Sequence, residues 1–173
     1  MVTINGNVTV GDGGQLAYLI YTDIQYAGQV YDTNELYNVV SMVNPTDNIY
    51  YGRMVKRIAA SASQIGQPTT DADDYKGVAL RDLADSGKGY FEAGKAVPVI
   101  TNGNVVVEVD QDVTADDPVY VRFTTAGGGL DLGVFRKDAD TNKAVLITNA
   151  RYISNSVTDK YGVKVAVVKL NLI

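Results

Sequence analysis

Residues 89–96, GYFEAGKA, come within one residue of the phosphate-binding loop GxxxxGK[ST]. In that loop, backbone N–H groups and the lysine hold phosphates, and the serine or threonine hydroxyl binds magnesium. Here Ala96 takes the hydroxyl position, and the following AVPVIT cannot begin a helix because Pro98 and the β-branched residues oppose it. We therefore predict a tight hairpin-type turn between strands at 89–91 and 96–101, and no nucleotide site.

Two acidic segments have the residue types of a cation site but lack its spacing. DADTN at 138–142 begins like an EF-hand calcium loop, which also needs a glycine and a final glutamate at fixed positions. Lys143 and Asn149 stand at those positions, so we predict a polar hairpin turn. DADD at 71–74 is predicted to be a solvated loop. The sequence therefore predicts no metal site.

Acid and base catalysis would have to rest on carboxylates, because the chain has no histidine and no cysteine. The candidates are Glu92, Glu108, Asp110 and Asp112. On a strand, Glu108 points away from the face that carries Val107 and Val109, so it is expected to face solvent. No partner carboxylate can be placed opposite it. We therefore predict no catalytic residue, no cofactor, no small-molecule substrate and no enzymatic activity.

The composition is typical of a soluble globular protein with one domain. The 173 residues are 46% hydrophobic and 20% charged, and a chain of this length buries about 70% of its extended surface. No apolar run approaches the roughly 18 residues of a membrane span, and the first residues do not resemble a secretory signal. The net charge of −5 disfavours nucleic acid, whose binding depends on Lys and Arg at phosphates. We expect neither a membrane nor a nucleic-acid partner.

Charged and aromatic residues are unevenly distributed along the chain. Residues 1–52 contain no Lys or Arg, but they hold five acidic residues and seven of the 12 tyrosines. Residues 53–173 carry 15 basic and 15 acidic groups, so the whole net charge lies in the first region. We predict one domain with two regions: an acidic, Tyr-rich N-terminal arm or strand region at 1–52, and a β-barrel or β-sandwich core at 53–173.

The first region shows β-type patterns. Residues 1–11 alternate apolar and polar types, which predicts a strand or a strand pair turning at Asn5-Gly6. Residues 14–32 are β-rich and largely uncharged, and we predict an extended arm. DTNE at 32–35 could cap a short helix that continues through LYNVVSMV at 36–43, where apolar residues have helical spacing. Extended chain suits the same residues, because Val-Val and Tyr favour strands, so both interpretations stay open.

The second region is almost purely β in pattern. A strand is predicted at 49–58 and a polar, mobile loop at 61–75. From residue 77 eight short apolar runs follow, separated by turn residues such as Asn102-Gly103-Asn104. The connections are too short for crossover helices. The predicted fold class is all-β: a single, mostly antiparallel β-barrel or β-sandwich with an extended N-terminal arm and little helix.

The succession of these segments resembles the tailed-phage capsid cement, or head decoration, proteins. The resemblance covers residues 28–173 and is most specific over 89–123. In order, the blocks are GQVYD (28–32), NVVSMVN (38–44), YYGRMV (50–55), GVALRD (77–82), GYFEAGKAVPVITNGNVVVEVDQDVTADDPVYVRF (89–123), GVFRKDADTNKAVLITNARYI (133–153) and VKVAVVKLNL (163–172).

This resemblance implies a non-enzymatic, β-rich virion protein that is usually trimeric. Such a protein lies on the outer surface of the head and clamps neighbouring major capsid subunits. The implied partners are the major capsid protein and further copies of the chain as a homotrimer, with no cofactor. The resemblance also implies synthesis in the bacterial host cytoplasm, and the absence of cysteine suits that reducing compartment.

The tyrosines of the first region are the candidate contact residues. Tyrosine buries well at interfaces and keeps a polar group, and we select Tyr18, Tyr21, Tyr26 and Tyr31. We expect the segment at 12–52 to dock on a trimer partner or on a capsid surface of complementary charge. Alternatively, these tyrosines line the protein's own core or trimer seam. Two other functions stay open: a glycan-binding β-sandwich with the tyrosines as sugar platforms, and a tail-associated virion structural protein.

Overall fold

The structure is a computed structural model that describes residues 3–4, 8–9, 26–31, 36–58, 61–82, 88–125, 131–159 and 161–172. Within these ranges the chain forms strands, turns and bends, and no helix. In chain order the strands are β1 (Thr3–Ile4), β2 (Val8–Thr9), β3 (Asn38–Val43), β4 (Ile49–Tyr50), β5 (Met54–Arg57), β6 (Ile65–Gly66), β7 (Tyr75–Ala79), β8 (Tyr90–Phe91), β9 (Ala96–Glu108), β10 (Tyr120–Arg122), β11 (Phe135–Arg136), β12 (Ala144–Leu146), β13 (Ala150–Tyr152), β14 (Val157–Thr158) and β15 (Lys164–Asn171).

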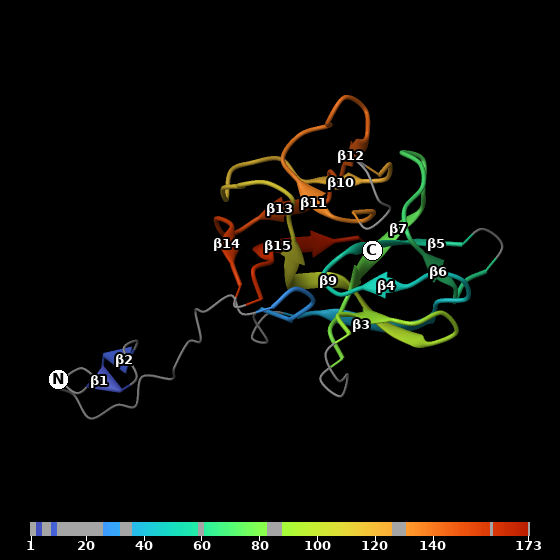
Figure 1. Cartoon of the computed structure of the whole chain (residues 1–173), viewed down its shortest axis with the longest axis horizontal. Helices are drawn as coiled ribbons and strands as arrows, with labels where there is room; N and C mark the ends of the chain where they lie inside the picture. Colours follow the sequence, from blue (N-terminus) through green and yellow to red (C-terminus); the bar gives the residue numbers. More distant parts are fainter. Residues whose placement is uncertain are drawn as a thin grey trace.

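The strands form a sandwich of antiparallel sheets. The largest sheet has the order β13-β15-β9-β7-β5-β6, with β14 paired to β15 and β3 to β9. A three-stranded sheet, β11-β10-β12, lies beside it (Figure 1). Val121 and Phe135 of this small sheet share one apolar core with Val105 and Val107 of β9. The large sheet does not close on itself within the described ranges, so the all-β prediction is confirmed as a sandwich.

The 13-residue strand β9 is the centre of the fold, and it corrects one prediction. Its first part pairs with β3 and β7 and its second part with β15. The triplet 102–104, predicted to be a turn, continues the strand, with Gly103 opposite Leu170 of β15. Gly103 has a φ of +121°, and a Cβ there would lie 2.7 Å from the Cβ of Tyr37. Glycine therefore serves here to let Tyr37 approach β9 closely where β9 changes partners, and not to reverse the chain.

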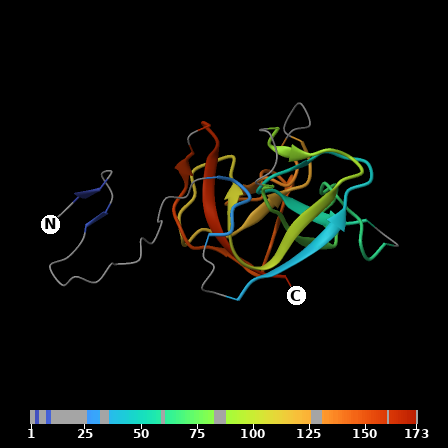
Figure 2. The same cartoon turned by 90° about the horizontal axis from the view of Figure 1, so that it is seen from below.

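Residues 38–43 form the strand β3, which decides between the two interpretations of this segment. In Figure 2, β3 (cyan) lies along β9 (yellow-green), and the two strands pair antiparallel. The residues at helical spacing share no buried face: Leu36 is 92% exposed and Val43 40% exposed. A helix would have gained little burial from this pattern, whereas β9 supplies a ladder of backbone hydrogen bonds. The predicted capping residues 32–35 lie outside the described residues.

The segment GYFEAGKA forms a turn, as predicted, but not a hairpin. Lys95 N–H donates to the carbonyl of Glu92 at 3.2 Å, and Gly94 has a φ of +82°. The strands on either side do not pair with each other, because β8 pairs with β4 and β9 pairs with β3. The turn therefore leads the chain from one sheet into another.

Two other predicted strands are each divided by a turn. The strand expected at 49–58 consists of β4 and β5, separated by a turn at Tyr51 and Gly52, where Gly52 has a φ of +71°. The run AVLITNARYI at 144–153 likewise contains β12, a turn at 148–149 and then β13. In both segments the run of apolar residues correctly predicted β-structure but overestimated the length of the strand.

The segment at 61–75, predicted to be a polar, mobile loop, is anchored to the large sheet. It contains β6, which pairs with β5. The carboxylate of Asp73 accepts hydrogen bonds from the N–H groups of Thr69 and Thr70, and it pairs with Lys56 of β5 at 3.0 Å. The acidic DADD motif therefore fastens this loop.

At the N-terminus, β1 and β2 pair antiparallel, so residues 1–11 contain the strand pair rather than one strand. Residues 26–31 pack on the large sheet, with Gly28 N–H donating to the carbonyl of Val106 at 2.8 Å. Residues 26–31 of the first region therefore belong to the body of the fold.

Candidate functional site

The segment that imitates a calcium loop belongs to an ionic cluster around two buried arginines, Arg122 of β10 and Arg136 of β11. Arg122 pairs with Asp110 at 2.8 Å and with Asp140 at 2.7 Å. Arg136 pairs with Asp110 at 2.9 Å and with Asp138 at 2.8 Å. The carboxylates of the motif are therefore counter-ions of guanidinium groups. Among the described residues, no three His, Cys, Asp or Glu side chains are placed to hold a metal ion.

The turn itself differs from the predicted hairpin. Asp140, Thr141 and Asn142 have φ values of 42°, 54° and 65°, a left-handed run that L-residues rarely adopt. This turn joins β11 to β12, which flank β10 and do not pair with each other. Both guanidinium groups bind its carboxylates, and these contacts hold the unusual backbone in place.

Burial and ion pairing shift the pKa values of this cluster in different directions. Burial raises the pKa of the Asp110 carboxyl, although Arg136 beside it acts in the opposite direction. The hydrogen bond from Arg136 lowers the pKa of Asp138. Burial also raises the pKa of Tyr152, whose hydroxyl donates to the Arg136 carbonyl at 3.1 Å. These shifts follow from a structural ion cluster and do not require a reactive group.

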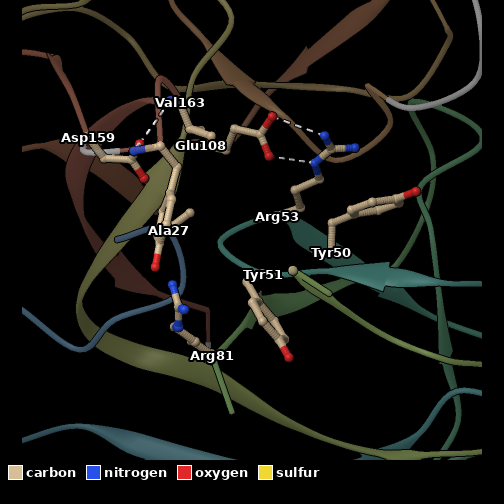
Figure 3. A pocket seen from close by; sticks show the side chains of 10 residues that line it. Ala27, Tyr50, Tyr51, Arg53, Arg81, Glu108, Asp159 and Val163 are labelled. Atoms are coloured by element: carbon tan, nitrogen blue, oxygen red, sulfur yellow. Dashed lines mark hydrogen bonds and ion pairs between the residues drawn. The ribbon is translucent and has the colours of Figure 1, made fainter. Parts of the chain in front are cut away.

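A pocket of about 430 Å³ opens on another part of the surface (Figure 3). Its walls come from the turn after β4, the chain after β7, the end of β9 and the connection between β14 and β15. The side chains that give it its character are Tyr50, Tyr51, Tyr161, Arg53, Arg81 and Glu108. The pocket is therefore rich in aromatic rings and guanidinium groups.

One side of the pocket is a closed ion pair. Arg53 donates to both carboxylate oxygens of Glu108, from Nε at 2.8 Å and from Nη2 at 3.0 Å. The Arg53 guanidinium also lies over the Tyr50 ring, 4.5 Å from its centroid. Glu108 was predicted to face solvent, but its side chain is only 24% exposed because the turn after β4 brings Arg53 opposite it.

The other side of the pocket holds Arg81 among tyrosine rings. Its guanidinium carbon lies 4.7 Å from the centroid of Tyr26, 5.9 Å from Tyr161 and 6.0 Å from Tyr51. The rings of Tyr26 and Tyr161 also contact each other, with centroids 5.6 Å apart. We call these four residues the Arg81 cage. It combines an apolar wall with a positive charge, which suits recognition of an anion on an apolar or aromatic carrier.

Comparison with known proteins shows what kind of chain carries this pocket. The family described as structural cement protein (E217 gp24/Pam3 gp6) matches residues 14–172. The chain belongs to this phage cement family. A solved chain from "The capsid of Myoviridae Phage XM1" superposes with a TM-score of 0.66 at 19% identity, covering 88% of this chain and 95% of that chain. At this identity the likeness shows a common fold. No curated protein matches the chain.

Membership of the cement family confirms the resemblance that the sequence blocks indicated, and it establishes a phage capsid structural protein. The family is described by a structural role and not by a reaction.

In the pocket of this member, Glu108 is bound to Arg53, and an Asp159 oxygen accepts the N–H groups of Tyr161 and Val163. Among the described residues, no helix is long and apolar enough to cross a lipid bilayer.

The four tyrosines selected from the sequence fall into three places in this cement-family chain. Tyr18 and Tyr21 lie outside the described residues. Tyr26 is part of the Arg81 cage. Tyr31 packs against an apolar cluster that includes Val106 of β9. Contact of these tyrosines with a partner stays a prediction.

Sequence reasoning missed Arg81 and Tyr161. They are 80 positions apart in the sequence, and neither belongs to a motif, so no local signal joins them. Only the placement of the chain after β7 beside the β14–β15 connection brings them together.

Proposed function

We propose that this chain is a cement protein on the outer surface of a phage head, where a homotrimer stabilises contacts between neighbouring major capsid subunits. The family match over residues 14–172 carries the proposal. We further propose that the protein is made in the cytoplasm of the bacterial host and joins heads there. A cement protein acts by burying surface on several neighbours at once, so its function requires contact surfaces and no active site.

The open edge of β3 supports a role in contact. Ser41 lies opposite Pro98, whose carbonyl accepts from Leu80 on the far side of β9. In this antiparallel arrangement the N–H and C=O groups of Ser41 point away from β9, toward the edge of the sheet. Within the described residues, the N–H of Val43 binds the Ser63 carbonyl, and no backbone partner meets Ser41 at this edge. An unpaired strand edge can accept a strand from another chain.

The side chains along this edge lack the features by which strand edges avoid association. The run LYNVVSMV at 36–43 contains no charge and no proline. Leu36 is 92% exposed, Tyr37 48% and Val39 38%. Apolar exposure of this kind is typical of a surface that another protein covers. This feature supports attachment to a neighbour in the shell.

The acidic segment at 12–52, including Tyr18, Tyr21, Tyr26 and Tyr31, is proposed to provide further contacts with the capsid or with another copy. Its charge would steer the protein to a basic surface, and an extended segment buries much area per residue. Mixing the full-length protein with empty heads and imaging the particles by electron microscopy tests the role directly. Ordered density at defined capsid positions is expected, and bare heads under saturating protein would contradict the proposal.

Deletion of residues 1–27 tests the arm. We expect head occupancy to fall by at least about ten-fold, because the arm's contact area is lost. Deletion of residues 1–9 is the matched control, since it removes β1 and β2 but leaves the acidic segment, and occupancy is expected to persist. Thermal unfolding of both variants checks that the body is intact. Unchanged occupancy after the longer deletion would exclude a role for the arm.

A further inference from the structure

Arg81 differs from the other arginines that are buried or half-buried in this fold. Arg53, Arg122 and Arg136 each pair with one or more carboxylates. Even the half-exposed Arg57 pairs with Asp74, at 2.7 Å. Arg81 is half-buried, yet no carboxylate of the described residues lies within ion-pair distance of it. The described residues supply counter-ions for the other enclosed guanidinium groups and none for that of Arg81.

The tyrosine rings only partly replace a counter-ion. They lie around the guanidinium of Arg81 at cation–π distances. A guanidinium has five N–H donors in its plane, and these need oxygen acceptors that ring faces do not provide. A carboxylate accepts two such donors side by side. The Arg81 cage is therefore shaped to receive a carboxylate whose carrier packs against tyrosine.

Neither described carboxylate of the pocket wall pairs with Arg81. Glu108 is bound at both oxygens by Arg53, and Figure 3 shows this pair lying across the pocket from Arg81. Asp159 accepts two backbone N–H groups at one oxygen, Oδ1, from Tyr161 at 2.8 Å and Val163 at 2.9 Å. The described pocket wall therefore supplies no ion pair to Arg81.

We propose that the Arg81 cage is the receptor for the acidic N-terminal segment of a second copy of this chain, entering through Asp12. Residues 10–25 contain Asp12 and Asp23 and no base, together with Tyr18 and Tyr21. The charge of this segment is complementary to Arg81, and its aromatic residues match the tyrosine rings of the cage. Tyr26 lies in the cage of its own copy, and the chain from Tyr26 back to Asp12 can span about 45 Å when extended, which is enough to reach a neighbouring subunit.

This arrangement deepens the proposed function, on whose assembly of several copies it rests. A segment of one copy in the pocket of the next is a head-to-tail contact, and a closed ring of copies satisfies every pocket and every segment. A homotrimer is one such ring. The pocket then determines how copies recognise each other, separately from how they bind the capsid.

Charge reversal in the full-length chain tests the proposal. Arg81→Glu gives a copy with an acidic segment and an acidic pocket, and Asp12→Lys gives a copy with a lysine at the contact position and Arg81. We expect each variant alone to self-associate at least about ten-fold more weakly than the unchanged chain in sedimentation experiments. Mixed together, the two variants are expected to associate with each other, because both contacts between unlike copies are complementary. In a ring of three, one contact joins two like copies, so partial recovery is expected.

Controls separate this inference from misfolding and from the proposed function. Arg151→Glu reverses an exposed arginine on β13 outside the pocket, and it is expected to leave association unchanged. Recovery in the mixture shows that both variants are folded. The inference is overturned if Arg81→Glu leaves self-association unchanged, or if the mixed variants do not associate with each other. It is also overturned if a glycan from an array binds in the pocket while self-association is unaffected. Head occupancy is scored separately, so failure of the unchanged chain to bind heads would count against the cement role alone.

Discussion

At the residue scale, the enclosed arginines show how a chain with net charge −5 uses its positive groups. Arg122 and Arg136 are 4% and 7% exposed, and four aspartates surround them: Asp110, Asp131, Asp138 and Asp140. Isolated buried charges cost several kcal/mol, roughly, unless they are paired and hydrogen-bonded. These ion pairs therefore join β10 and β11 to the end of β9 rather than serve in chemistry.

Asp110 is the shared partner in this cluster, and its replacement measures the cluster's contribution. Asp110→Asn removes the charge that binds both Arg122 and Arg136. We expect the free energy of unfolding to fall by about 2 kcal/mol, less than for a fully buried pair because Arg122 keeps Asp140. Urea unfolding followed by tyrosine fluorescence gives this value.

The matched control for Asp110→Asn is Asp112→Asn. Asp112 pairs with Lys164 at 2.8 Å, but its side chain is 87% exposed. Exposed ion pairs contribute little to stability, so no measurable change is expected. Equal effects of the two variants would show that the cluster is not a stabilising tie.

At the element scale, the strands are organised by β9 and by glycines that allow close approach to it. Gly77 of β7 has a φ of +156°, and a Cβ there would lie 2.1 Å from the backbone oxygen of Ile100. The neighbouring residue, Val78, pairs with Ile100 across the two strands. The β7–β9 pairing therefore depends on the absence of a side chain at one position.

Gly77→Ala is expected to destabilise the protein strongly, by about 3 kcal/mol or more, because a backbone atom cannot yield to the added methyl group. Gly162→Ala is the control. Gly162 also has a φ that favours glycine, +81°, but nothing lies within 4 Å of the position that an added Cβ would take. There the expected loss is about 1 kcal/mol from backbone strain alone. Thermal unfolding of both variants compares them, and equal shifts in Tm would contradict the close approach.

At the scale of the whole molecule, the fold is a β-sandwich body with its excess negative charge in the first 52 residues. Among its described residues, the body carries a strand edge at β3 where Ser41 has no backbone partner, and it carries the pocket with the Arg81 cage. Several surfaces on one small body suit a protein that contacts more than one neighbour. The proposed shell role therefore follows from surfaces, and the core's task is to hold them in fixed positions.

Acid should destabilise this body through its anchored carboxylates. Burial alone would raise the pKa of Asp73, but hydrogen bonds from Thr69 and Thr70 and the charge of Lys56 lower it overall. A folded pKa below the unfolded one gives stability that is present above about pH 4 and is lost as pH falls through the folded pKa. The raised pKa of Asp110 acts in the opposite direction and partly offsets this loss.

Asp73→Asn tests that dependence. We expect the variant to be less stable than the unchanged chain at pH 7, and we expect the difference between them to shrink at pH 3, where Asp73 is increasingly protonated. Urea unfolding at both pH values measures the two differences. A difference that does not change with pH would mean that the charge of Asp73 does not anchor the loop.

The fold was largely predictable because apolar alternation and short connections are local properties of the chain. The all-β class, the strand pair at 1–11 and most strand positions followed from them, as did the turn at 89–96. Strand lengths and the role of Gly103 did not, because a strand continues only where a partner strand lies beside it. The site was less predictable: Tyr26 was selected as a contact residue, whereas nothing in the sequence pointed to Arg81 or Tyr161.

The sequence by itself determined the fold class, the absence of motifs for nucleotide or calcium binding, and the family, since these depend on residue types in fixed order. Only the tertiary structure decided which charges meet. It placed Arg53 on Glu108 and two arginines on the acidic turn, and it left Arg81 among three rings. Ion pairs between distant positions depend on strand order and chain direction in three dimensions, and the sequence pattern of a single strand carries no such information.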